Sequence, residues 1–240
     1  MAVETVFGCI PFAFPALPGI RCVFTTRERG TLSFYQLDDK ERERVAAARK
    51  TLCNDLGVTQ WTELMQVHGD TFIINPETTL VETESALKAD GHSTDRKNHA
   101  LCIKTADCQP IFLAHPKGYI GAMHVGWRGN TLNFINTAVD SFCRNYGLDP
   151  TEVCAVRGPS LGNAEFVNFD SEWPKEYSPW YNPATHRVDL WALTRWQLGE
   201  AGLKPQNMYS LDVCTYSVNS VFFSYRRKDA GRQMGLIWME

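Results

Sequence analysis

Three segments of the chain repeat apolar residues every three or four positions, which is the period of an amphipathic helix. In the first segment these residues follow two acidic positions and end at Gly57: Val45, Ala48, Leu52 and Leu56. Acidic residues at the start of a helix and a glycine after its end are typical boundary signals. The pattern predicts a helix between Asp38 and Gly57, and further helices over residues 130–146 and 189–201, each followed by glycine.

Between these helices, short runs rich in β-branched and aromatic residues predict strands. The clearest runs are 21–25, 71–75, 101–105, 110–114, 119–125, 153–157, 220–225 and 235–239. Three of them follow one another between residues 101 and 125, and short connections join antiparallel rather than parallel neighbours. The pattern therefore predicts an α+β (mixed α/β) fold, in which mixed β-sheets are flanked by helices.

Composition sets limits on the partners of this fold. Hydrophobic residues make up 44% and charged residues 21% of the chain, enough apolar material for a substantial core. The formal net charge of −3 is spread along a mixed sequence without a basic stripe. We therefore expect no nucleic-acid partner, whereas a small anionic or nucleoside-like ligand is compatible with this charge. Because no repeat or linker interrupts the chain, we expect one domain over residues 1–240.

The cysteines and the N-terminal sequence indicate in which cellular compartment the protein resides. No two of the eight cysteines form a C-x-x-C pair, and most lie in apolar runs, as is usual for buried thiols in a reducing environment. Prolines interrupt the apolar stretch near the N-terminus, which also lacks a basic region, and this argues against a signal peptide. No apolar run approaches the roughly 20 residues of a membrane helix. We expect a cytoplasmic protein with no membrane partner.

Reactive side chains lie beside glycine at predicted strand ends in three segments, residues 66–70, 104–110 and 123–129. His68 lies in a loop, His124 ends an apolar strand, and Cys108 has polar neighbours, unlike most of the other cysteines. A thiol in a polar turn can ionise, whereas a thiol in the core is inert. Two imidazoles and one thiol fit a zinc site with three protein ligands and an open fourth position. They also fit a Cys–His nucleophile pair.

A candidate anion site follows His124 in the chain. Arg128 lies in a glycine-containing turn directly before the predicted helix 130–146. The N–H groups at a helix start favour anions, and a guanidinium binds phosphate or carboxylate with two parallel hydrogen bonds. This segment is compatible both with an anion site and with a structural turn that carries an exposed arginine.

Several short blocks of the sequence resemble the signature of one known family. The main blocks are QVHG (66–69), ADG (89–91), TADC (105–108) and HVGWRG (124–129). Further blocks follow in the same order: FTTR (24–27), GPS (158–160), CT (214–215), FFSYRR (222–227) and GRQ (231–233). On these motifs, which span nearly the whole chain, the sequence is identified as a member of the YfiH-like family, also called laccase-domain, polyphenol oxidase or purine nucleoside phosphorylase proteins.

The resemblance implies a fold, a centre and a set of activities. The fold would be a single domain of mixed sheets flanked by helices, likened to cysteine hydrolases. His68, Cys108 and His124 would converge on one zinc ion or one reactive centre. Members of the family are described as cleaving purine nucleosides with phosphate, as deaminating adenosine, as oxidising polyphenols with copper, and as hydrolysing wrongly built peptidoglycan precursors.

The chain departs from the family pattern in three places. The glycine-rich stretch after FTTR reads GTLSFYQL (30–37), the family's cysteines after GPS are replaced by LGNAE (161–165), and the link between Arg227 and Gly231 is short. These segments are expected to shape the substrate pocket, so the resemblance specifies the reactive centre better than the substrate.

Chemical requirements separate these activities. A laccase needs a trinuclear copper cluster beside a blue-copper centre, and four histidines remain once His68 and His124 are used, too few for both. Copper in place of zinc would then give oxidation as a side activity. Zinc deaminases carry a glutamate in H-x-E, which is missing here, so one carboxylate of Asp70, Asp90 or Asp107 would move the proton.

Phosphorolysis needs an anion site near the ribose, for which the candidates are Arg27, Arg128 and Arg226. Trp127 or Phe222 could stack on the purine. The leading hypothesis is a zinc-dependent purine nucleoside phosphorylase with companion adenosine deaminase activity, whose partners are a nucleoside and phosphate. The alternatives are a Cys108-dependent amide hydrolase acting on a cell-wall precursor, and a non-catalytic zinc-stabilised binding protein. The last is disfavoured because structural zinc sites are normally closed by four ligands.

Overall fold

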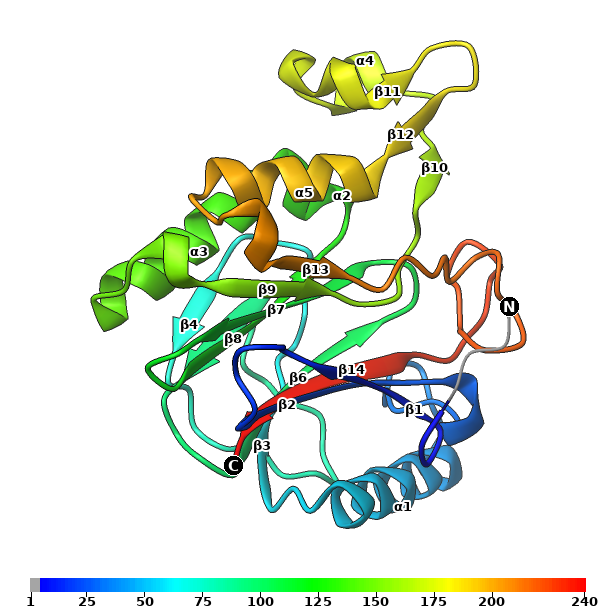
Figure 1. Cartoon of the computed structure of the whole chain (residues 1–240). Helices are drawn as coiled ribbons and strands as arrows, with labels where there is room; N and C mark the ends of the chain where they lie inside the picture. Colours follow the sequence, from blue (N-terminus) through cyan, green and yellow to red (C-terminus); the bar gives the residue numbers. More distant parts are fainter. Residues whose placement is uncertain (1–4) are drawn as a thin grey trace.

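The structure is a computed structural model that describes residues 5–240. Two mixed β-sheets pack face to face, and helices cover their outer faces (Figure 1). The five-stranded sheet has the order β1 (Cys9–Ala13), β2 (Ile20–Thr25), β14 (Gln233–Met239), β6 (His99–Thr105) and β3 (Gln60–Thr62). The six-stranded sheet has the order β13 (Met208–Ser210), β9 (Cys154–Arg157), β7 (Gln109–His115), β8 (Tyr119–Val125), β5 (Gly91–Thr94) and β4 (Phe72–Ile74).

Antiparallel pairs predominate, as the short connections predict. Parallel pairing occurs at β3 with β6, at β4 with β5 and at β13 with β9, each at an edge of its sheet. The α+β class with mixed sheets and flanking helices is therefore confirmed.

Three apolar layers hold these elements together. Phe24 of β2 stacks on Phe112 of β7 at 5.5 Å, at the centre of the core between the two sheets. The outer face of the six-stranded sheet packs on α3 (Phe134–Tyr146) and α5 (Leu190–Glu200). The outer face of the five-stranded sheet packs on α1 (Asp39–Leu56). The site described below lies where strands from both sheets end.

The predicted helix between Asp38 and Gly57 is confirmed, with the expected end signals. The Asp38 side chain accepts a hydrogen bond from the Glu41 backbone, and the Glu41 side chain accepts one from Asp38 in return. Gly57 ends the helix at φ 67°, in the left-handed region that glycine adopts most easily. The helix predicted over 189–201 is α5, which Asp189 caps.

The helix predicted over residues 130–146 is wrong at its start. A short helix, α2 (Trp127–Thr131), comes first, and α3 begins at Phe134. Between them Asn133 has φ 57°, a left-handed conformation that ends one helix before the next begins. Arg128 therefore lies inside the first turn of a five-residue helix rather than before the start of a long one.

Seven of the eight predicted strands are confirmed within one to two residues, as β2, β4, β6, β7, β8, β9 and β14. The strand predicted over residues 220–225 is wrong, because this segment consists of turns and irregular backbone. Its apolar residues serve a loop: Phe222 is buried, and the Val221 and Phe222 amides donate back to the Val218 carbonyl. Phe222 is therefore a core residue and does not face a ligand.

A small arm extends from the six-stranded sheet between β9 and α5 (Figure 1). It contains the sheet β10 (Asn163–Glu165), β12 (Arg187–Asp189) and β11 (Tyr181–Asn182), together with α4 (Phe169–Glu172) and η3 (Lys175–Trp180). The remaining 3₁₀ turns are η1 (Arg27–Arg29), η2 (Pro150–Glu152) and η4 (Pro205–Asn207). Aromatic residues fill the core of the arm, for example Phe169 and Tyr181, whose rings stack at 4.0 Å. Across residues 5–240, no helix has both the length and the apolar character needed to cross a membrane.

Candidate functional site

Three elements bring His68, Cys108 and His124 together. His68 lies in the loop between β3 and β4, Cys108 in the turn between β6 and β7, and His124 near the end of β8. Their ligand atoms all lie within 4.8 Å of one another. The Nε2 atom of His68 lies 3.8 Å from the Cys108 sulfur, and the two imidazole rings meet edge to face at 4.8 Å. Among residues 5–240, this is the one group of histidine, cysteine and acidic side chains arranged to hold a metal ion.

Asp90 organises two of these three residues. Its carboxylate accepts hydrogen bonds from the backbone amides of Val67, His68 and Gly69, at 2.7 to 3.1 Å. These bonds hold the loop in a shape that places His68 at φ 60°. The same carboxylate lies 2.7 Å from Nδ1 of His124, which leaves the Nε2 atom of that ring free for the centre.

Gly126 allows the backbone to approach the centre closely. A Cβ atom at this position would lie 2.9 Å from the Cys108 sulfur and 3.4 Å from Cδ2 of His68. Any larger residue would push the thiol away from the imidazoles. Close packing at the centre therefore requires glycine at this position of the HVGWRG block.

The charges of the centre favour an ionised thiol. Burial alone would raise the pKa of Cys108, but the charge of His124 and hydrogen bonds from both histidines lower it to about 6. Burial would lower the pKa of His124, but the Cys108 thiolate and the hydrogen bond to Asp90 raise it to about 9. Burial opposes ionisation of Asp90 too, yet His124 and the loop amides lower its pKa. The lowered pKa of Cys108 and the raised pKa of His124 together favour a thiolate beside an imidazolium at neutral pH.

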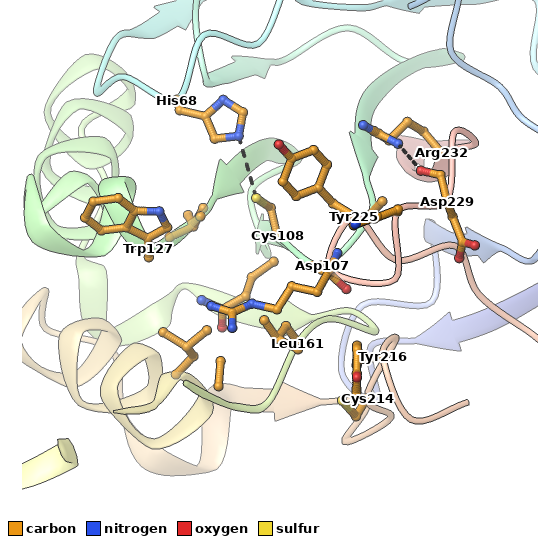
Figure 2. A pocket seen from close by; sticks show the side chains of 18 of the residues that line it. His68, Asp107, Cys108, Trp127, Leu161, Cys214, Tyr216, Tyr225, Asp229 and Arg232 are labelled. Atoms are coloured by element: carbon orange, nitrogen blue, oxygen red, sulfur yellow. Dashed lines mark hydrogen bonds between the residues drawn. The ribbon is translucent and has the colours of Figure 1, made fainter. Parts of the chain in front are cut away.

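The centre opens into a cavity of about 1260 Å³ (Figure 2). His68 and Cys108 line it, and Trp127 and Leu161 form part of its wall. Five cationic side chains also line the cavity: Arg128, Arg187, Arg226, Lys228 and Arg232. Three acidic residues also line the cavity, Asp107, Glu165 and Asp229, and Asp107 and Asp229 are already bound to neighbouring donors. The five cationic side chains therefore leave the cavity with a cationic excess.

The three arginines proposed from the sequence occupy different positions. Arg128 and Arg226 line the cavity, and each stacks on an aromatic ring, Trp127 at 4.6 Å and Phe166 at 4.9 Å. The Arg226 guanidinium also donates to the Glu165 carbonyl. These contacts place both guanidinium groups at the cavity wall, although both residues are exposed.

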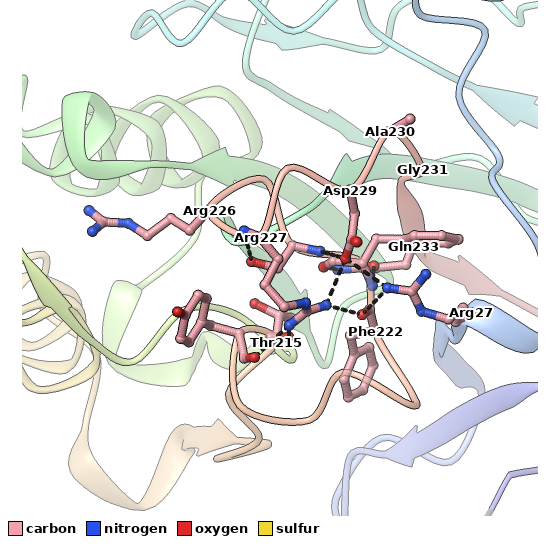
Figure 3. Close-up of polar contacts among 12 residues, drawn as sticks. Arg27, Thr215, Phe222, Arg226, Arg227, Asp229, Ala230, Gly231 and Gln233 are labelled. Atoms are coloured by element: carbon pink, nitrogen blue, oxygen red, sulfur yellow. Dashed lines mark hydrogen bonds and ion pairs between the residues drawn. The ribbon is translucent and has the colours of Figure 1, made fainter.

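Arg27 lies outside the cavity lining and instead binds the loop of residues 211–232, which joins β13 to β14 (Figure 3). It donates to Asp229 at 2.7 Å and to the Phe222 carbonyl at 3.0 Å, and it lies over the Phe223 ring. Arg227 donates to the same two oxygens. A role for Arg27 in phosphate binding stays a prediction, and these contacts favour a positioning role.

The three candidate carboxylates also differ. Asp107, at φ 91°, accepts hydrogen bonds from Thr215, Ser224 and the Arg226 amide at 2.8 to 2.9 Å. It lines the cavity next to Cys108, whereas Asp90 is buried behind the histidines and Asp70 is exposed outside the lining. The structure shows hydrogen-bonding roles for Asp90 and Asp107, and proton transfer by any of the three stays a prediction.

Sequence reasoning missed several residues of the cavity. Arg187 comes from β12 of the arm, and no motif marks it in the sequence. Lys228 and Arg232 follow the FFSYRR block, and Gln109 lies directly beside Cys108. The polar identity of Gln109 at the start of an otherwise apolar strand is the one signal that could have identified it.

The four remaining histidines do not assemble a copper cluster. His92 and His99 are buried near each other, where burial lowers their pKa values to about 3 and about 4. His115 lies at the far end of β7, and His186 lies in the arm beside Tyr181. The structure thus supports the counting argument against a trinuclear site within the described residues.

The fold and the donor set define a class of protein: an α+β protein whose open His–Cys–His centre, compatible with metal binding, faces a cationic cavity. A family model described as "Multi-copper polyphenol oxidoreductase laccase" matches residues 21–240. The chain belongs to this laccase-domain family, as its sequence blocks indicate.

Similar proteins carry the name purine nucleoside phosphorylase. The protein PA4543 of Pseudomonas aeruginosa is 28% identical over 249 residues, covering 95% of this chain and 96% of the relative. A Xylella fastidiosa protein is 33% identical, with 94% and 95% covered. YlmD of Bacillus subtilis is 33% identical over 172 residues, which cover 66% of this chain and 62% of that relative.

Solved structures share the fold. The Bacillus licheniformis hypothetical protein YfiH superposes with a TM-score of 0.82 at 25% identity, covering 92% of this chain and 93% of the other. YlmD from Geobacillus stearothermophilus has a TM-score of 0.84 at 24% identity, covering 99% and 98%.

Proposed function

We propose that this protein cleaves purine nucleosides with phosphate and deaminates adenosine as a companion activity, at the His68–Cys108–His124 centre. The observation that carries the proposal is the convergence of these three ligand atoms within 4.8 Å at the wall of a cavity with a cationic excess. The names of the relatives support the same reaction class.

The donor set fits a zinc ion. Two imidazole nitrogens and one thiolate are typical zinc ligands, and ligand atoms in a tetrahedral zinc site lie roughly 3.5 Å apart. The present separations of up to 4.8 Å need a modest contraction to reach this geometry. Zinc, or copper in its place, would supply Lewis-acid chemistry to a reactant at the open position.

The chain's own residues would bind the phosphate. The Arg128 and Arg226 guanidinium groups stand on the Trp127 and Phe166 rings, which in turn contact each other at 6.1 Å. A planar guanidinium binds phosphate oxygens in bidentate fashion, and stacking reduces the entropy lost on binding. Phosphate would therefore bind between α2 and the arm. Of the candidate carboxylates, Asp107 is best placed to carry a proton for deamination, because it lines the cavity beside the thiol.

The direct test is turnover of adenosine by the purified, metal-loaded protein. With phosphate, chromatography should show adenine and ribose 1-phosphate, with a smaller amount of inosine. Without phosphate, adenine release should stop while inosine formation continues. Loss of adenine release in Arg128→Gln with retained inosine formation would support the phosphate site. Adenine release that does not depend on phosphate would contradict phosphorolysis.

One observation favours a second candidate, a cysteine-dependent amide hydrolase acting on a peptidoglycan precursor. The hydrogen bond between Asp90 and His124, together with the lowered pKa of Cys108, resembles the order of an orienting acid, a base and a nucleophile. Removing the metal with a chelator distinguishes the two candidate functions, because only the nucleoside reactions are expected to need it. Hydrolysis of a muramyl-peptide substrate that survives chelation but stops on thiol alkylation would establish the second function in place of the first.

A further inference from the structure

Exposed tyrosines gather at the functional cavity. The chain contains eight tyrosines, and five of them are buried or half-buried. The other three, Tyr35, Tyr216 and Tyr225, have 55%, 50% and 70% of their surface exposed, and all three line the cavity. Single apolar residues on a surface are ordinary. Exposed aromatic rings that all border one cavity instead indicate a ligand that covers them.

The two rings that the sequence suggested for stacking are already in use. Phe222 has no accessible surface. Trp127 lies against the Arg128 guanidinium at 4.6 Å and contacts the rings of Phe166 and Trp173 at 6.1 and 6.0 Å. A flat ligand in the cavity therefore needs another ring to stack on, and an exposed tyrosine supplies one.

The residues on both sides of Tyr225 are bound to the turn that carries Cys108. The Ser224 hydroxyl donates to Asp107 Oδ2 at 2.9 Å, and the Arg226 amide donates to the same oxygen at 2.8 Å. Asp107 directly precedes Cys108 in the chain. These two hydrogen bonds hold Tyr225 beside the candidate metal centre.

The Tyr225 ring is supported by a cation and is accessible from the cavity. The Arg232 guanidinium lies over the ring at 5.8 Å and donates to three successive backbone carbonyls, which hold it in place. Figure 2 shows the ring in the cavity between Cys108 and Arg232, whereas Tyr216 lies apart from them, beside Cys214. Because 70% of the surface of Tyr225 is exposed, a ligand at the centre can reach its ring.

Resting on the proposed function, we propose that the purine base of the nucleoside stacks on the Tyr225 ring. Arg226, the next residue, is one of the two proposed phosphate ligands, so one short segment contacts both the base and the phosphate. Every nucleobase has a flat π face, and a stacking contact reads the size of this face more than the groups at its edge. Tyr225 therefore favours purines over pyrimidines and accepts different purines with similar affinity.

The test measures the affinity of the zinc-loaded protein for inosine by calorimetry in phosphate-free buffer. Inosine has no 6-amino group to lose and is not cleaved without phosphate, so the ligand stays intact. Tyr225→Leu removes the ring, and Tyr225→Phe keeps it. Phe7→Leu is the matched control, because Phe7 is 64% exposed but lies outside the cavity lining. We expect inosine to bind about tenfold more weakly to Tyr225→Leu, with changes of less than about twofold in the other two variants.

Each result has a distinct meaning. Unchanged inosine affinity in folded Tyr225→Leu overturns the inference, as does an equal loss in Tyr225→Phe, which would assign the contact to the hydroxyl group. A larger loss in Tyr216→Leu than in Tyr225→Leu overturns it too, because the base would then stack elsewhere in the cavity.

If Tyr225→Leu does not fold, Tyr225→Trp decides. Its larger ring should bind inosine at least as tightly as the wild-type protein does, and inosine should quench the added tryptophan fluorescence. Absence of this quenching overturns the inference. Wild-type protein that binds inosine through Tyr225, yet does not cleave it when phosphate is added, would contradict the proposed function and not this inference.

Discussion

Asp90 shows how a single side chain shapes the centre. It holds the His68 loop through three backbone amides and fixes the His124 ring through Nδ1. Its negative charge raises the pKa of His124, and the charge of His124 in turn lowers that of Cys108. The reactivity of the thiol therefore depends on a carboxylate that does not touch it.

This dependence predicts the effect of Asp90→Asn on thiol reactivity. In metal-free wild-type protein, the rate of alkylation of Cys108 should rise with pH through a midpoint near 6, because only the thiolate reacts. In Asp90→Asn, His124 loses its charged partner, so the thiol pKa should rise and the midpoint should move toward the value of an ordinary thiol. Mass-spectrometric alkylation rates measure both midpoints. A wild-type midpoint near 9, or one that the substitution leaves in place, would contradict this account.

At the scale of elements, a buried ion cluster ties α1 to the five-stranded sheet. Glu63, directly after β3, pairs with Arg49 of α1 at 2.7 Å and with Lys104 of β6 at 2.6 Å. Arg49 is fully buried, and it also donates to the Leu32 carbonyl. Through Lys104 the cluster also holds β6, and Cys108 lies in the turn that follows this strand.

Glu63→Gln should lower the free energy of unfolding by about 3 kcal/mol or more, because it leaves a buried guanidinium without its counter-charge. Urea denaturation at neutral pH measures the change. Arg21→Gln is the matched control, since it removes an ion pair with Glu240 in which both side chains are about half exposed, and it should lower the free energy of unfolding far less because water screens an exposed pair. If both variants lose a similar amount of the free energy of unfolding, burial does not determine how strongly the ion cluster stabilises the protein.

The sequence predicted those elements whose signals are local. The strands β6, β7 and β8 are seven residues each, long enough for a clear apolar run, and α1 carries its caps in the sequence. The short strands β3 and β11 show no alternation, whereas β4, also three residues long, was predicted because it lies within the longer β-branched and aromatic run 71–75. The break at Asn133 was missed because the apolar period continues across it, and residues 220–225 were misread because burial in a loop gives the same pattern as a strand.

The candidate site likewise contains some residues that could be predicted from the sequence and others that could not. His68, Cys108 and His124 were predicted because they lie in specific blocks, although their residue types alone left two chemistries open. Arg187 could not be predicted, because it reaches the cavity through the pairing of β12 with β10. Its position depends on a tertiary arrangement that leaves no motif in the sequence.

At the scale of the whole molecule, the arm and the two-sheet body share the cavity wall. Trp127 of α2 contacts Phe166 and Trp173 of the arm at 6.1 and 6.0 Å. Through these rings the arm supports Arg128 and Arg226, which come from elements outside it. The arm is therefore expected to affect phosphate binding more than the chemistry at Cys108.

Phe166→Leu should raise the KM for phosphate by about two- to fivefold and leave kcat nearly unchanged, since a stacked guanidinium gains about 0.5–1 kcal/mol from the ring. Steady-state kinetics at varied phosphate measures both constants. Phe169→Leu is the control, because Phe169 stacks on Tyr181 inside the arm and does not line the cavity. An equal rise in KM in the control would assign the effect to general loosening of the arm.

The proposed chemistry depends most directly on three side chains that hold one metal ion and leave one position open. The decisive measurement is the metal content and X-ray absorption spectrum of zinc-reconstituted protein, for the wild type and for Cys108→Ala. We expect one zinc per chain, bound by one sulfur and by nitrogen or oxygen ligands that include a non-protein group. In the variant we expect loss of the sulfur ligand and weaker binding. Zinc binding that is unchanged in Cys108→Ala, or a spectrum without a sulfur ligand in the wild type, would contradict the proposed chemistry.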